Sequence, residues 1–247
     1  MPTHPLPILL LTLSLGGIAC QQKKPDSGSP TAPATAAALP NNLLDPSPDN
    51  FLIIPGTQVG AIDSAATEAS LIGLLGAENA CRDTIYTVEG QYEIGTTLFK
   101  NTADQAQILW RDTLRFARPA TVLIRPARDE NNALLPGTAG ATTQWTTPDG
   151  LTPGMTIAAV EKCNGRPFSL YGFEWDYGGQ TSGWRGGRLA ETSGVTYLSL
   201  GFVVPDNRAA VYRKRYEQVL GDAEFSSDSP AMQQLQPVVQ TMTVSFR

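Results

Sequence analysis

The spacing of hydrophobic side chains predicts a chain in which short helices alternate with strands. Leu71, Leu74 and Leu75 follow the i, i+3, i+4 spacing of one buried helix face. Beyond residue 84, hydrophobic and polar side chains alternate, most regularly over 92–98, as they do in a strand with one buried face. This pattern indicates an α+β fold with a largely antiparallel sheet and short helices on one of its faces.

Further elements are predicted along the chain. Strands bounded by turn or proline residues are expected at 107–111, 121–125, 143–146 and 194–204. A helix is expected over 209–220, where Gly221 ends it, and a very short helix is expected to start at Pro230. The last predicted strand places Met242, Val244 and Phe246 on one face.

The first residues have the pattern of an export signal. The apolar run at 6–18 is shorter than the about 20 residues that a membrane span needs, and small and polar residues follow it. Gly17-Ile18-Ala19-Cys20 resembles the lipobox of bacterial lipoproteins. The resemblance implies a cleaved signal peptide at 1–19 and a mature protein that is acylated, for example with palmitate, on Cys20. An ordinary secretory signal cleaved near Ala19 and a misplaced start codon are the alternatives.

The segment after Cys20 is predicted to be a flexible tether. Residues 21–50 contain six prolines and no aromatic residue, so they cannot bury enough apolar surface to offset the entropy lost on ordering. Treated as a flexible coil, such a segment reaches roughly 30 Å. The sequence therefore divides into the signal peptide, a lipidated cysteine with a disordered tether at 20–50, and one globular domain at 51–247.

The net charge and the numbers of histidines and cysteines limit the kinds of partner and reaction that the chain can have. A net charge of −5 and a pI near 4.9 argue against a nucleic-acid partner. The one histidine, His4, lies in the predicted signal, so the mature chain has no imidazole for a catalytic base or a metal site. We therefore expect no catalytic constellation, no metal and no cofactor. Cys81 and Cys163 could form a disulfide in an oxidising compartment, or they could remain as two buried thiols.

Two segments match at an offset of 89 residues. Thr67 corresponds to Thr156 and Gly76 to Gly165, with hydrophobic residues between them in both copies. Each copy predicts a threonine N-cap, a short helix and a closing glycine. The sequence therefore predicts two tandem helix–strand repeats, at about 62–80 and 151–169.

The second copy carries a family resemblance. Gly150-Leu151-Thr152-Pro153-Gly154-Met155-Thr156, followed by Val160 and by Asn164-Gly165-Arg166-Pro167, resembles a segment of small outer-membrane lipoproteins of the SmpA/OmlA type and of β-lactamase-inhibitor-like domains. Those families imply short helices on an antiparallel sheet, and binding of other proteins without catalysis. Residues 150–187 are also similar to an uncharacterised family of bacterial lipoproteins, which implies no activity.

These features together lead us to expect a lipoprotein of the cell envelope. Cys20 would anchor it in the membrane, expected to be the outer membrane, facing the periplasm or the cell surface. The domain would be a non-catalytic protein-binding or scaffold module with an unidentified protein partner.

The segment 168–187 is the densest candidate site. Its aromatic residues alternate with acidic or small ones, which predicts a strand with one aromatic face. One interpretation is a platform for a glycan or small ligand, with polar selectors beside it; its residues would be Tyr171, Trp175, Tyr177, Trp184, Glu174, Asp176 and Arg185. The alternative is that the aromatic face packs in the core and Gly178-Gly179 forms a hairpin turn. A third hypothesis is a hydrolase that uses Glu174 and Asp176 as its carboxylate pair.

Overall fold

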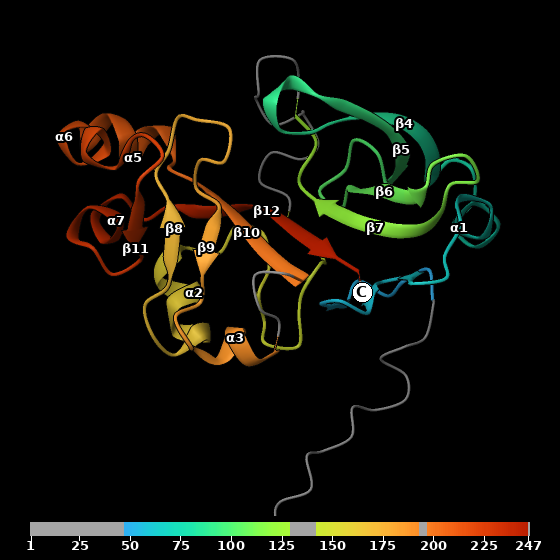
Figure 1. Cartoon of the computed structure of the whole chain (residues 1–247), viewed down its shortest axis with the longest axis horizontal. Helices are drawn as coiled ribbons and strands as arrows, with labels where there is room; N and C mark the ends of the chain where they lie inside the picture. The colour runs from blue at the N-terminus through green and yellow to red at the C-terminus, as the bar shows by residue number, and fades with distance from the viewer. Residues whose placement is uncertain (1–46, 129–141, 193–196, 247) are drawn as a thin grey trace, which may run out of the picture. The chain divides into compact units, whose positions relative to one another are not determined.

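The structure is a computed structural model that describes residues 47–128, 142–192 and 197–246 (Figure 1). Its antiparallel strands form three sheets accompanied by short helices, which confirms the α+β class. The predicted signal peptide, Cys20 and nearly all of the predicted tether lie outside the described residues. No helix among the described residues combines the length and the apolar character needed to cross a membrane.

The largest sheet has six strands, and every neighbouring pair is antiparallel. In spatial order they are β10 (Leu198–Val203), β12 (Val238–Ser245), β7 (Ala117–Ile124), β6 (Ala106–Asp112), β5 (Tyr92–Leu98) and β4 (Ala80–Tyr86). Strand β12, the last along the sequence, therefore lies between β10 and β7 (Figure 1). Met242, Val244 and Phe246 are all buried in this region, as predicted.

Two small sheets and several short helices complete the described fold. One sheet joins β1 (Ile53–Ile54), β2 (Gln58–Val59) and β3 (Ile62–Asp63), and the other has the order β11 (Glu224–Ser226), β8 (Ser169–Tyr171), β9 (Thr181–Gly183). The helices include α1 (Glu68–Leu75), α2 (Ile157–Asn164), α3 (Arg188–Thr192), α5 (Asp206–Val211), α6 (Arg213–Tyr216) and α7 (Pro230–Leu235). Two single turns of 3-10 helix are η2 (Val88–Gly90) and η3 (Glu217–Val219).

Helices α1 and α2 begin and end as their sequences predict. The hydroxyl of Thr67 accepts a hydrogen bond from Ser70 N at 3.0 Å, and that of Thr156 accepts from Ala159 N at 3.3 Å. Both helices have eight residues, and each is followed by a glycine with a positive φ, 87° at Gly76 and 77° at Gly165. Threonine oxygens satisfy amides that have no partner inside a helix, which explains the starting points.

Two element predictions outside the aromatic segment were wrong. The helix expected over 209–220 is interrupted at Tyr212, whose φ of −109° and ψ of 39° leave the helical region, so the segment forms α5, α6 and η3. The strand expected over 143–146 is reduced to an isolated bridge between Leu52 and Thr146. Trp145 of this segment is nevertheless buried, and its indole nitrogen donates to Asp104 O at 2.8 Å.

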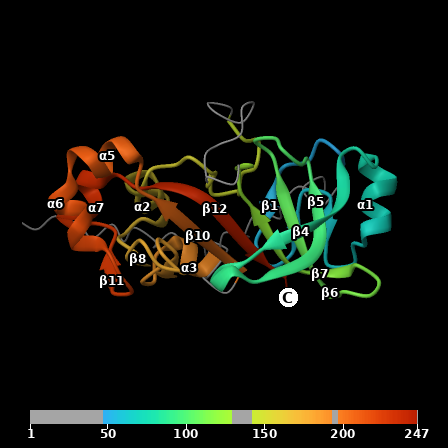
Figure 2. The same cartoon turned by 90° about the horizontal axis from the view of Figure 1, so that it is seen from above.

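Helix α1 lies beside β4 at one end of the large sheet (Figure 2), and a polar network attaches it to that sheet. Glu68, in the first turn of α1, pairs with Arg82 of β4 and accepts from the Thr96 hydroxyl of β5 at 3.0 Å. That hydroxyl accepts from the indole of Trp110 at 2.9 Å, and the Arg82 guanidinium lies 3.8 Å from the centre of the Phe116 ring. Because Glu68 and Thr96 are buried and hydrogen-bonded, α1 is fixed over the base of the β4–β5 hairpin.

Candidate binding surfaces

The strand predicted from the alternating aromatic residues of 168–187 is much shorter in the structure. Strand β8 ends at Tyr171, and Glu174 adopts a φ of 64°, which no extended strand accommodates. Residues 172–180 instead form a folded loop, closed by hydrogen bonds from Gly178 N to Trp175 O at 2.9 Å and from Gly179 N to Gly172 O at 3.0 Å. The alternation of aromatic residues therefore does not put them on one face of a sheet.

Three aromatic residues of the segment, Phe168 among them, lie in the core. Phe173 and Trp184 are each less than 5% exposed, and the Trp184 ring lies 5.4 Å from that of Phe168. The prediction that Trp184 belongs to a ligand platform was therefore wrong, because its ring packs against other buried rings. The core interpretation holds for this part of the segment.

Three aromatic residues of the loop and of the end of β8 are at least partly exposed. The ring of Trp175 makes an edge contact with Tyr171 at 5.5 Å and lies 5.3 Å from the ring of Tyr177, which is 40% exposed. The Trp175 indole donates to Gly172 O at 3.0 Å, which fixes its orientation. Tyr171, Trp175 and Tyr177 form what we call the aromatic loop cluster.

The polar residues predicted to serve this cluster have different roles. Glu174 accepts a hydrogen bond from the Tyr216 hydroxyl; burial and this bond raise the pKa of Tyr216 above its ordinary value. Asp176 is exposed. Arg185 donates to Ser169 at 2.7 Å and to Ser226 at 2.8 Å, so its guanidinium is held by β8 and β11. Neither Glu174 nor Asp176 lines the pockets beside α1, beside α2 or at the end of β7.

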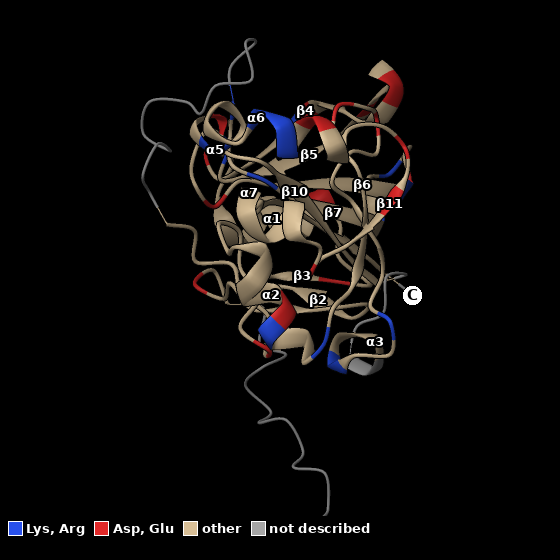
Figure 3. Ribbon diagram, turned by 90° about the vertical axis from the view of Figure 1, so that its left-hand side faces the viewer, with Lys and Arg blue, Asp and Glu red and all other residues tan. Residues whose placement is uncertain are grey.

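Helix α6, which supplies Tyr216, is rich in basic residues (Figure 3). Arg213 pairs with Glu217 at 3.2 Å, and Arg215 donates to Gln218 and Gln234. These contacts lie within α6 and its neighbours and do not create a site for a ligand.

The structure has no disulfide between Cys81 and Cys163. Both thiols are free and partly buried. Cys81 belongs to the edge strand β4, whereas Cys163 belongs to α2, which packs against α3 and α7. Of the two alternatives for these cysteines, the structure therefore has the separate thiols and not the disulfide.

The β4–β5 hairpin is a surface that the sequence analysis missed. The two strands pair over seven residues each, but β5 pairs with β6 only from Thr96 to Leu98. The part beyond β6, residues 84–94, which we call the hairpin tip, exposes Tyr86 and Tyr92 by 64% each, Ile94 by 44% and Val88 by 39%. The rings of Tyr86 and Tyr92, directly opposite each other in register, are 6.3 Å apart. These four residues are almost half of the large hydrophobic side chains exposed in the described part of the chain.

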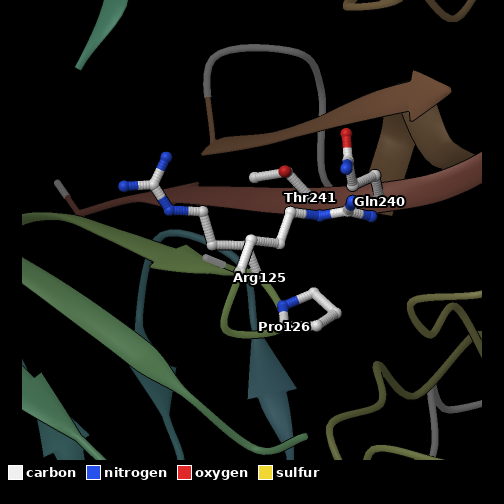
Figure 4. Close-up of a pocket in the computed structure, with 5 residues that line it drawn as sticks. Arg125, Pro126, Gln240 and Thr241 are labelled. Atoms are coloured by element: carbon white, nitrogen blue, oxygen red, sulfur yellow. The ribbon is translucent and has the colours of Figure 1, made fainter. Parts of the chain in front are cut away.

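One small pocket lies where β7 ends, and its lining residues are Arg125, Pro126, Arg128, Gln240 and Thr241 (Figure 4). Gln240 is the extra residue of a β-bulge, because Thr241 pairs with Gly201 while Val239 pairs with Phe202. The volume of about 120 Å³ is small for a ligand pocket.

Comparisons with known proteins identify no relative. No family model matches the chain, and neither a curated protein nor a solved structure matches it. Among the described residues, no three His, Cys, Asp or Glu side chains come together as a metal site would require.

Proposed function

We propose that this protein is a lipid-anchored envelope lipoprotein whose domain binds another protein without catalysis, and that the hairpin tip is the contact surface. The observation that carries the proposal is the grouping of Tyr86, Val88, Tyr92 and Ile94 on a two-stranded projection. Contiguous exposed apolar side chains of this kind mark interaction sites, and tyrosine is enriched in protein interfaces.

The charges around the tip define the partner's chemistry. Glu89 is exposed in the turn next to Val88, and Glu93 is exposed on the opposite face of the hairpin from Tyr92 and Ile94. The acid nearer the base, Asp83, is paired with Lys100 at 2.9 Å. We therefore propose a partner with an apolar depression and Lys or Arg side chains at its rim. Complementary rim charges would act mainly on the rate of association.

Site-specific crosslinking tests this surface. A photoreactive side chain at position 92 should give one discrete protein adduct in intact envelopes, and the additional substitutions Tyr86→Ser and Ile94→Ser should remove it. The matched control places the same group at Leu114, which is 92% exposed and lies in the β6–β7 turn. No adduct from position 92, or equal adducts from both positions, would contradict the proposal.

The membrane anchor is proposed from Cys20 and the segments on either side of it. Labelled palmitate should be incorporated into the wild-type chain in a bacterial host and not into Cys20→Ser. The same substitution should release the protein from the outer-membrane fraction, where we propose that it faces the periplasm or the cell surface. Incorporation that persists in Cys20→Ser would count against an anchor at this residue.

A glycan or another small ligand at the aromatic loop cluster is the second candidate function. It is favoured by the contacts among Tyr171, Trp175 and Tyr177, since exposed aromatic rings can stack on apolar ring faces. Trp110, Trp145 and Trp184 are buried, so quenching of tryptophan fluorescence by acrylamide reports mainly on Trp175. Soluble peptidoglycan fragments should protect the wild type from quenching, and Trp175→Phe should lose this response. Unchanged quenching would remove this candidate.

We also propose that the two halves of the domain are tandem repeats, as the 89-residue offset suggests. Each N-cap threonine forms an isolated bridge to the first residue of a strand, Thr67 to Ala117 of β7 and Thr156 to Val238 of β12. The next amide of each helix donates to the residue before that strand, with both bonds at 2.8 Å. Since β7 and β12 are neighbours, these matched contacts would place the two copies on either side of their shared boundary.

A further inference from the structure

The hairpin tip is held to the rest of the molecule by one fully buried side chain, Ile85, and by few hydrogen bonds. Its own strands pair with each other through Tyr86 and Tyr92, but the ladder between β5 and β6 stops at Thr96. Within the described parts of the chain, one side-chain hydrogen bond from outside the hairpin reaches residues 84–94: Arg125 Nη2 donates to Tyr86 O at 2.9 Å.

Arg125 is itself fixed before it reaches the hairpin. It is the first residue after β7, and its Nε donates to Gln107 Oε1 in β6 at 2.8 Å. Gln107 is buried, with only 7% of its surface exposed. Burial lowers the pKa of Arg125, but a guanidinium remains protonated in proteins. The planar guanidinium of Arg125 therefore joins Gln107 of β6 to Tyr86 at the end of β4 through two charge-assisted hydrogen bonds.

We propose that Arg125 is a positioning residue that holds the hairpin tip in the orientation needed to bind the protein partner. The binding part of this inference rests on the proposed function, whereas the orienting part rests on the two hydrogen bonds alone.

Hydrogen exchange on the full chain tests the orienting role. Arg125→Gln should raise the exchange rates of amides in 84–94 by about tenfold, as expected for the loss of a hydrogen bond to a charged group. Exchange in β12 should stay unchanged. Arg115→Gln is the matched control, since this mostly exposed arginine contacts Asp112 in the β6–β7 turn.

A second variant distinguishes the effect of misdirecting the Arg125 side chain from the effect of removing its charge. Gln107→Leu leaves Arg125 in place but removes the acceptor that directs it, and it should raise exchange in the same residues by a smaller factor. Unchanged exchange of 84–94 in Arg125→Gln would overturn the inference. So would an equal increase in β12, since that result reports general destabilisation.

The crosslinker at position 92 separates the two proposals. If the wild type gives the adduct, Arg125→Gln should lower its yield several-fold while Arg115→Gln leaves it unchanged. An adduct of equal yield in Arg125→Gln would overturn the inference and leave the proposed function standing. If the wild type gives no adduct, the proposed function fails, and hydrogen exchange alone decides whether Arg125 orients the tip.

Discussion

The base and the tip of the β4–β5 hairpin share one face but have opposite surroundings. At the base, Arg82 and Thr96 lie opposite each other, and Glu68 of α1 binds both. At the tip, Tyr86 and Tyr92 occupy equivalent opposed positions, and they are exposed. On this face the polar contact between Glu68 and Thr96 is buried at the base, whereas the apolar side chains of the tip are exposed. A covered polar site needs a complete hydrogen-bond network, whereas an uncovered apolar site is available to a partner.

Gly95, at the boundary between base and tip, gives the largest expected effect. A Cβ at this position would lie 2.2 Å from Ile108 O and 2.4 Å from Ile85 Cδ1. We expect Gly95→Ala to destabilise the domain by about 3 kcal/mol, because backbone and core must move to admit it. Urea unfolding measures the difference. Gly183→Ala is the control, since its Cβ would meet no atom within 4 Å, and equal losses in both variants would refute the prediction.

A smaller effect is expected when a carboxylate is removed from the base. Glu68→Ala leaves Arg82 and the Thr96 hydroxyl without their partner, so we expect a loss of about 2 kcal/mol. The matched change at the tip is Glu93→Ala, at an exposed position, where we expect less than about 0.5 kcal/mol. Thermal and urea unfolding of both variants compare the two ends directly. Equal losses would mean that the base is no more dependent on its polar contacts than the tip.

The smallest expected effect is the pH dependence due to Asp83, on the opposite face of the hairpin. Burial tends to raise the pKa of Asp83, but hydrogen bonds from Lys100 and Thr97 outweigh it and lower the pKa below 3.8. A lowered pKa in the folded state adds stability above the unfolded pKa, and this stability is lost as the pH falls through the folded value. Because the pair is partly exposed, we expect less than about 1 kcal/mol. Asp83→Asn should flatten the stability curve between about pH 4 and pH 2; a curve of unchanged slope would contradict this.

The sequence predicted local structure well where a short-range contact decides it. The threonine caps and closing glycines of α1 and α2 depend on residues within one turn, and both helices have the predicted starts. The last strand was predicted from its alternation, which the burial of Met242, Val244 and Phe246 confirms. Such features need no knowledge of the rest of the fold.

The candidate sites could not be predicted in the same way, because alternation does not say what covers a face. Tyr92 and Ile94 share one period-two pattern with Leu98, yet only Leu98 is buried, because the neighbouring strand reaches only part of β5. In the aromatic segment, the positive φ of Glu174 turns the chain so that Trp175 reaches the surface while Trp184 enters the core. The Glu89-Gly90 turn between two tyrosine-bearing strands was the one available sign of the hairpin.

The position of β12 has a consequence for the order of folding. The strands β4 to β7 form a meander of neighbours along the chain, so their pairing closes short loops. The six-stranded sheet is complete only when β12, more than a hundred residues after β7, enters between β7 and β10. We therefore expect the first half to acquire structure early, and the second half to wait until the final strand has emerged from the ribosome. Until then the exposed edge of β7 is the part of the chain most open to mispairing.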